Sequence, residues 1–417
     1  MTPPVERSDS PFLQVANAIG RRLCRDALWA GGACNWHGSR LRRDGTRAEF
    51  GRGPQPPTLG AGAAGIGLFL STLCRFDDDP LIAATARGAL THAVRHVPGI
   101  GSLGFLNGVS GVLYAVREAD AALASDARRA LDEAGVRRIR DLQRQACLAA
   151  REAGGRDLSA GYALASAIPV LLGFTASGDG WPIESAMALG AVIRDTDWRA
   201  VPVDETDPAA AATHSLARVS LARALLELEI ATSDRAWRTA AVDLLDGWTA
   251  PQPPAFWPGT QQAFGMDAHD TERGVASTIN ADVVRVVELL GRESALDDYA
   301  RQLVDQTAVS LTRPLQVGDG GLSMACGATG RIEVLTLAAA ALGRTEFGDL
   351  APGFAENAIN AFMAPKLPWP CAAPQDHEPP DLMFGLAGIG YFYLRLHSPA
   401  TVPQLVAGGR QAAVVHS

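Results

Sequence analysis

One pattern of small and apolar residues recurs along the chain. Its clearest copies read Gly-x-x-Gly followed by an aliphatic run, as in LGAGAAGIGLFL from Leu59 and MFGLAGIGYFYLRL from Met383. Two more intact copies begin at Leu106 and Met324, and weaker ones lie between them. Residues at the first glycine position of the motif are Gly62, Gly108, Gly161, Ser215, Ala281, Gly327 and Gly385. A repeat of about 50 residues is typical of stacked helical units.

The aliphatic runs are apolar on every side, which predicts buried helices. Between them lie segments rich in Ala, Leu and Arg, whose starts at Asp79, Asp126 and Asp234 offer N-cap residues. Few stretches alternate between polar and apolar residues, so little sheet is expected. The pattern therefore predicts an all-α fold of about seven helical hairpins, each with a buried glycine-led helix and a charged outer helix.

Seven hairpins can stack as an open solenoid or close into a ring. A solenoid needs atypical polar repeats at its ends, yet the last motif is as strong as the first. We therefore expect a closed ring in one domain, 1–417. It comprises an N-terminal helix and CNWHG loop (1–50), the seven-hairpin ring (51–400) and a tail (401–417), and the Pro-rich segments are interpreted as loops.

Composition narrows the function classes. The chain is 47% hydrophobic and 20% charged, which excludes a disordered protein. Its net charge of −8 argues against non-specific nucleic-acid binding. Six scattered cysteines do not form a disulfide framework, and neither a secretory signal nor an apolar run of membrane-span length is visible. We expect a soluble, cytoplasmic protein with reduced thiols and no membrane span.

Gly60, Gly62 and Gly65 match the spacing of a dinucleotide-binding fingerprint. That fingerprint follows a strand and precedes an acidic residue that binds the ribose. Here PQPPTL precedes the glycines, and the same pattern recurs along the chain. The interpretation favoured is therefore that the glycines allow close helix packing.

The glycine-led helices, ALWAGGACNWHG from Ala27 and DLMFGLAGIGYFYLRL from Asp381 together resemble the lanthionine synthetase C-like (LanC-like) family. The resemblance spans about Leu23 to Leu396. It implies an α/α toroid that forms lanthionine and methyllanthionine thioether rings by Michael-type addition of peptide Cys thiols to dehydroamino acids. The partners it implies are a ribosomally made precursor peptide (RiPP) with dehydrated Ser/Thr and Cys, and dehydrating kinase-like or lyase proteins.

The resemblance also implies a zinc ion, held by one cysteine of the fifth motif and a Cys-His pair of the sixth. The matching residues here are Ile279, Ala325 and Cys326. One thiolate cannot replace a three-ligand catalytic site, so we predict that the family zinc is absent and that no cofactor is used. A substitute site built from Cys326, Cys371 and His377 stays open, because its spacing is not diagnostic.

Candidate catalytic residues also come from the resemblance, which implies a histidine in the fourth motif and an aspartate before the third. His214 and Asp157 match these positions. Without zinc a base must take the thiol proton, and histidine has a suitable pKa near 6.5. Asp157 is expected to orient His214 or move protons, and Arg218 and Arg331 to stabilise oxyanion charge. Each residue also has a purely structural interpretation. His214 would be a hydrogen-bonded histidine at a helix start, Asp157 an N-cap, and the two arginines members of salt bridges.

Four further residues at motif starts are predicted to bind substrate. Tyr162 offers a hydroxyl, and Asn107 and Asn280 offer amides. Cys326 lies nearest the expected centre, where it is a nucleophile only if a neighbour lowers its pKa; otherwise it is a buried, inert thiol.

Two other functions remain. A catalytically degenerate LanC-like scaffold would bind the precursor peptide or partner modification enzymes without chemistry. A toroid glycosidase would need two positioned carboxylates, and the motif starts offer only Asp157 and Asp282. The sequence therefore favours a zinc-independent lanthipeptide cyclase.

Overall fold

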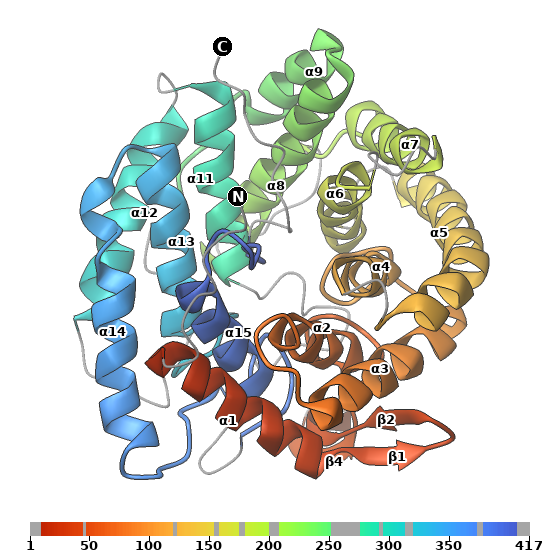
Figure 1. The fold of residues 1–417 in the computed structure, drawn as a ribbon. Coiled ribbons are helices and arrows are strands. Elements are labelled where there is room, and N and C mark those ends of the chain that lie inside the picture. The colour runs from red at the N-terminus through yellow and green to blue at the C-terminus, as the bar shows by residue number, and fades with distance from the viewer. Residues whose placement is uncertain are drawn as a thin grey trace, which may run out of the picture.

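A computed structural model describes residues 10–44, 47–119, 123–153, 158–174, 180–199, 208–251, 276–291, 295–312, 320–372 and 378–406. Helices dominate this part of the chain (Figure 1). Its strands form two antiparallel pairs near the N-terminus: β1 (Leu28–Ala30) with β2 (Ala33–Asn35), and β3 (His37–Asp44) with β4 (Arg47–Pro54). The expectation of a helical fold with little sheet is confirmed.

The helices form an inner and an outer set. The inner helices are α2 (Ala63–Leu73), α4 (Val109–Glu118), α6 (Leu158–Leu172), α8 (Pro208–Thr232), α11 (Ala276–Leu290), α13 (Ala328–Ala341) and α15 (Leu386–His397). The outer helices are α1 (Pro11–Asp26), α3 (Pro80–Arg95), α5 (Ser125–Ala153), α7 (Trp181–Asp195), α9 (Arg235–Leu245), α12 (Ala295–Leu311) and α14 (Leu350–Ala358). The described residues also include two short 3-10 helices, η1 (Val97–Gly99) and η5 (Thr345–Phe347), and a π-helical turn, η6 (Ile359–Met363).

Inner helices follow one another around the molecule, each backed by an outer helix (Figure 1). Helix α15 packs on α2, so the last inner helix is joined to the first. On its other side, Arg395 of α15 pairs with Glu333 of α13 at 2.8 Å. The outer partner of α15 is α1, from the opposite end of the chain. The sequence pattern did not predict that α1 packs on α15. This contact joins the two ends of the described chain.

Each intact motif places its first glycine immediately before an inner helix. Gly62 precedes α2 and Gly385 precedes α15, and the next N–H donates to a carbonyl of the preceding loop, at 2.8 Å in both cases. In the eroded motifs the helices α6, α8 and α11 begin upstream of the motif position. The glycine therefore marks where the loop folds back on the helix start.

The second glycine allows a close backbone approach. A Cβ atom on Gly65 would lie 2.0 Å from the Leu59 carbonyl oxygen, and one on Gly388 would lie 1.9 Å from that of Leu382. Gly111 and Gly330 have the same relation to their own loops. These contacts support the interpretation of the glycines as packing residues.

Gly388→Ala is expected to lower the free energy of unfolding by at least about 2 kcal/mol, because the new methyl group overlaps backbone. Gly353→Ala is the matched control: no atom lies within 4 Å of its Cβ position, and it sits inside α14. Alanine there should raise stability by about 0.5–1 kcal/mol. Urea unfolding of both variants checks the pair, and equal midpoints would contradict the packing role.

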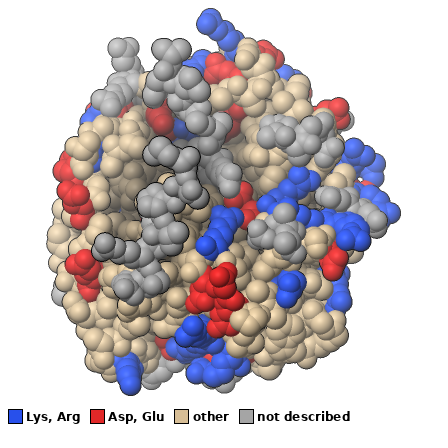
Figure 2. Space-filling model, in the orientation of Figure 1, with Lys and Arg blue, Asp and Glu red and all other residues tan. Residues whose placement is uncertain are grey.

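The outer helices carry the predicted caps and most of the charge. Asp79 accepts from the Leu81 N–H and Asp234 from the Ala236 N–H, each at 2.9 Å. Asp126 instead lies inside the first turn of α5. Acidic and basic side chains are scattered over the face in Figure 2, both at its rim and near its middle. None of the described helices combines the length and the apolar character that a membrane crossing requires.

Candidate functional site

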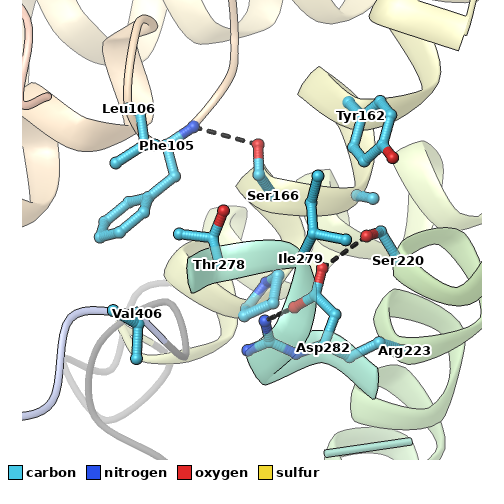
Figure 3. Close-up of a pocket in the computed structure, with 12 residues that line it drawn as sticks. Phe105, Leu106, Tyr162, Ser166, Ser220, Arg223, Thr278, Ile279, Asp282 and Val406 are labelled. Carbon is cyan, nitrogen blue, oxygen red and sulfur yellow. Dashed lines mark hydrogen bonds and ion pairs between the residues drawn. The ribbon is translucent and has the colours of Figure 1, made fainter. Parts of the chain in front are cut away.

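One pocket lies inside the ring, between the inner helices α6, α8 and α11 and the loop before α4 (Figure 3). Its apolar wall includes Phe105, Leu106, Ile279 and Val406. The polar groups on its lining are Tyr162, Ser166, Ser220, Arg223, Thr278 and Asp282. The open space left between them is about 40 Å³, which is room for one or a few water molecules.

The polar wall is built across the α8–α11 contact. Asp282 of α11 accepts a hydrogen bond from the Ser220 hydroxyl at 2.5 Å and pairs with the Arg223 guanidinium (Figure 3). Both charged side chains are nearly buried, at 8% exposure for Arg223 and 13% for Asp282. On the opposite side, Ser166 of α6 accepts from the Phe105 N–H at 3.1 Å. The pocket thus offers a carboxylate and a guanidinium that are both largely shielded from solvent.

The charges continue along the same helix pair. Arg285 of α11 is completely buried and bonds to Glu227 of α8 at 2.9 Å and to Glu288 at 2.6 Å. Burial alone would lower the pKa of Arg285, but the two carboxylates outweigh it and raise that pKa. Because Ser220, Arg223 and Glu227 are three to four residues apart, they share one face of α8.

His214 and Arg218 lie on another face of α8. His214 Nε2 bonds to the Trp198 carbonyl beyond α7 at 3.1 Å, and Arg218 donates to carbonyls at the end of α9. Neither residue lines the pocket. A helical step of 100° puts His214 about 180° from Arg223, so the structure does not bring the predicted base to the polar wall.

The environment of His214 fixes its tautomer. A carbonyl oxygen only accepts, so Nε2 carries the proton and Nδ1 is the basic nitrogen. Partial burial lowers the pKa of His214, and Arg218 lowers it further, while the bond to Trp198 opposes them. The ring is therefore neutral at pH 7, and its predicted catalytic role stays a prediction.

Arg218 closes the end of α9. Its Nε donates to the Leu244 carbonyl at 2.8 Å and its Nη2 to that of Asp246 at 2.6 Å. We expect Arg218→Met to cost about 2–3 kcal/mol of unfolding free energy, because two charge-assisted bonds are lost. Arg87→Met, at an exposed site on α3, should stay within about 0.5 kcal/mol. A loss of activity at an unchanged urea midpoint would instead support the catalytic role.

The residues that match the family's zinc positions do not suit a zinc ion. Ile279 presents an apolar side chain to the pocket, and Ala325 has no donor. Cys326 is fully buried beside the Ser323 hydroxyl at 3.6 Å, and burial raises the pKa of its thiol. Within the described ranges, no three His, Cys, Asp or Glu side chains gather closely enough to hold a metal ion.

The other predicted residues are spread around the ring. Tyr162 is 5% exposed and lines the pocket. Arg331 bonds to Ser310 of the outer helix α12 at 3.3 Å. Asn280 is fully buried beside the pocket-lining stretch of α11. Asn107 is half-buried in the loop before α4.

Two predicted residues, Asp157 and His377, lie outside the described residues.

Sequence reasoning missed Ser220 and Arg223 as site residues and considered Asp282 only as a glycosidase carboxylate. Their signal was polar residues at helical spacing within otherwise apolar segments. Such groups must be paired or face a cavity, and here they do both.

Comparison with known proteins adds one finding. The family model described as "Lanthionine synthetase C-like protein" matches residues 290–406, which run from the end of α11 through α15 into the C-terminal segment. No curated protein matches the chain. The match and the ring of glycine-led helices agree with the expected resemblance, and over residues 290–406 the chain is similar to the lanthionine synthetase C-like family.

Proposed function

We propose that the protein is a lanthipeptide cyclase that works without zinc. It would add Cys thiols of a dehydrated precursor peptide to dehydroalanine or dehydrobutyrine and so form thioether rings. The observation that carries the proposal is the pocket of Figure 3, a partly apolar site inside a LanC-like ring with one carboxylate and one guanidinium in its wall. Its apolar side suits the dehydroamino acid, and its charged side suits the proton transfers.

The chemistry needs one proton to move from sulfur to carbon. The thiol gives its proton to a base while sulfur bonds to the β-carbon, and the double-bond electrons pass to the amide oxygen. We assign the base to Asp282 and the stabilisation of the enolate oxygen to Arg223. Asp282 then returns the proton to the α-carbon, so all atoms of peptide and enzyme are accounted for. Tyr162, on the same pocket lining, would bind the peptide.

No step is assigned to a metal, because the donor set at Ile279, Ala325 and Cys326 offers one buried thiol. His214 remains the alternative base, with Asp157 as its partner and Arg218 or Arg331 near the oxyanion. The two assignments differ in an assay, since Asp282→Asn should abolish cyclisation under the first and His214→Gln under the second.

The experiment uses the purified full chain with a dehydrated, cysteine-containing precursor in the presence of a chelator. Free thiols are then alkylated and counted by mass spectrometry. Protection of cysteines that are alkylated in an enzyme-free sample is the expected result. Alkylation of every cysteine at all enzyme concentrations would refute the proposal.

The second candidate is a scaffold that binds the precursor, or partner modification enzymes such as dehydrating kinase-like and lyase proteins, without chemistry. It is favoured by the ion pair that already engages Asp282. A scaffold would bind the precursor while Asp282→Asn, His214→Gln and the unsubstituted chain all leave the thiols free.

A further inference from the structure

The C-terminal segment Ser398–Val406 leaves α15 and enters the ring. It starts where the Ser398 N–H donates to the Leu394 carbonyl at 2.9 Å, and it ends at Val406, which lines the pocket beside α11 (Figure 3). Between these two points the Pro403 carbonyl accepts a hydrogen bond from Tyr391. Tyr391 precedes Ser398 by seven residues, or about 10 Å along the axis of α15. The segment thus runs back along α15 from its C-terminal end toward the pocket.

Three successive carbonyls of this segment accept hydrogen bonds from side chains of the ring. Thr401 O accepts from Arg75 Nη1 at 3.2 Å, Val402 O from Arg395 Nη1 at 3.2 Å, and Pro403 O from Tyr391 Oη at 2.9 Å. Such bonds recognise main chain and do not depend on the side chains of the bound segment. We name Arg75, Arg395 and Tyr391 the carbonyl track.

Other contacts hold the track in place without the segment. Arg395 Nε is fixed by Glu333 at 2.8 Å, and Arg75 Nη2 by the carbonyl of Glu118. The Tyr391 side chain is buried in α15. Because these donors are positioned by the ring itself, they are preorganised to bind a peptide.

Apolar contacts fill the rest of the passage. Val402 is 0% exposed, Leu405 3% and Val406 1%. Val406 is itself one of the residues that line the pocket, so an extended peptide bound along the same carbonyls would occupy the place of the segment. A peptide that reaches Asp282 by this passage must therefore displace the segment.

We propose that the carbonyl track and the pocket form a channel for an extended peptide, and that Thr401–Val406 is an internal ligand which substrate displaces. The proposal deepens the proposed function and rests on it for the identity of the displacing peptide. Its physical core, a main-chain binding channel, is testable with a peptide that has neither a thiol nor a dehydroamino acid.

The test compares the full chain with one that ends at Ala400, using the fluorescein-labelled hexapeptide Thr-Val-Pro-Gln-Leu-Val. Fluorescence anisotropy should show binding to the shortened chain at least about tenfold tighter than to the full chain. In the shortened chain, Tyr391→Phe should weaken binding about fivefold, because one hydrogen bond is lost. Equal binding to both chains, or none to a shortened chain with native circular dichroism, overturns the proposal.

A second variant keeps the chain at full length, in case the shortened chain does not fold. In Val406→Cys the new thiol should react slowly with iodoacetamide, followed at that site by mass spectrometry. Excess unlabelled hexapeptide should speed the reaction at least about tenfold by displacing the segment. Rapid reaction without the hexapeptide, or an unchanged rate with it, overturns the proposal. Neither readout depends on cyclisation, so failure here is distinct from failure of the cyclase assignment.

Discussion

Arg285→Met is expected to lower the free energy of unfolding by about 3–5 kcal/mol. Arg285 has no solvent exposure and lies between Glu227 of α8 and Glu288 of α11. Methionine fills much of the volume but leaves Glu288 without its cation, and Glu227 with only the more distant Arg223 at 3.9 Å. The cost is therefore that of poorly compensated charge between the two helices, and urea unfolding followed by circular dichroism measures it.

Arg301→Met is the matched control. Arg301 pairs with Asp297 one turn away on α12, and its side chain is 37% exposed, so its loss should cost less than about 1 kcal/mol. Adding Glu227→Gln to Arg285→Met should recover part of the lost stability, because a nearly buried charge that has lost its nearest cation is removed. Equal losses for Arg285→Met and Arg301→Met would show that the buried cation does not hold α8 and α11 together.

The fold was largely predictable because its motif has a local physical cause. A glycine that packs against its own loop, as at Gly65 and Gly388, recurs at a fixed position of the motif. A helix that is apolar on every side is visible as an aliphatic run after it. The pairing of α1 with α15 was not predictable in this way. It depends on where the ring closes, which no short-range pattern records.

The candidate site was harder to predict for a related reason. Helix α8 carries apolar residues on every side, so the periodicity of its sequence does not show which of its faces lines the interior of the ring. His214 and Arg218 were chosen by motif position, and their partners lie beyond α7 and α9. Arg223 lies on the pocket lining, and only the position of α11 distinguishes the two faces.

Helix α11 links the altered motif to the chemistry proposed here. Ile279 occupies the first expected zinc-ligand position, and Asp282, one helical turn later, lines the same pocket. Helix α11 thus presents the apolar side chain of Ile279 where the resemblance implies a zinc-binding cysteine, and the carboxylate of Asp282 lines the pocket next to it. If the ring still performs the addition, its proton transfers have to be carried by groups such as Asp282 and Arg223.

Asp282→Asn is accordingly expected to slow thioether formation at least about a hundredfold. The amide keeps the shape of the carboxylate and can still accept from Ser220, but it cannot take a thiol proton. Arg223 retains Glu227 at 3.9 Å as a counter-charge, which limits the structural cost. The rate of ring closure is followed by thiol alkylation under single-turnover conditions, with precursor binding measured in parallel.

Asp297→Asn is the control, because Asp297 is also a nearly buried aspartate in an arginine pair but lies on α12, away from the pocket lining. It should leave the rate unchanged. A slow Asp282→Asn variant that still binds precursor and keeps its circular dichroism spectrum separates a catalytic base from a structural ion pair. An unchanged rate in Asp282→Asn would contradict the assignment of Asp282. If His214→Gln abolished ring closure at the same time, the role of base would return to His214.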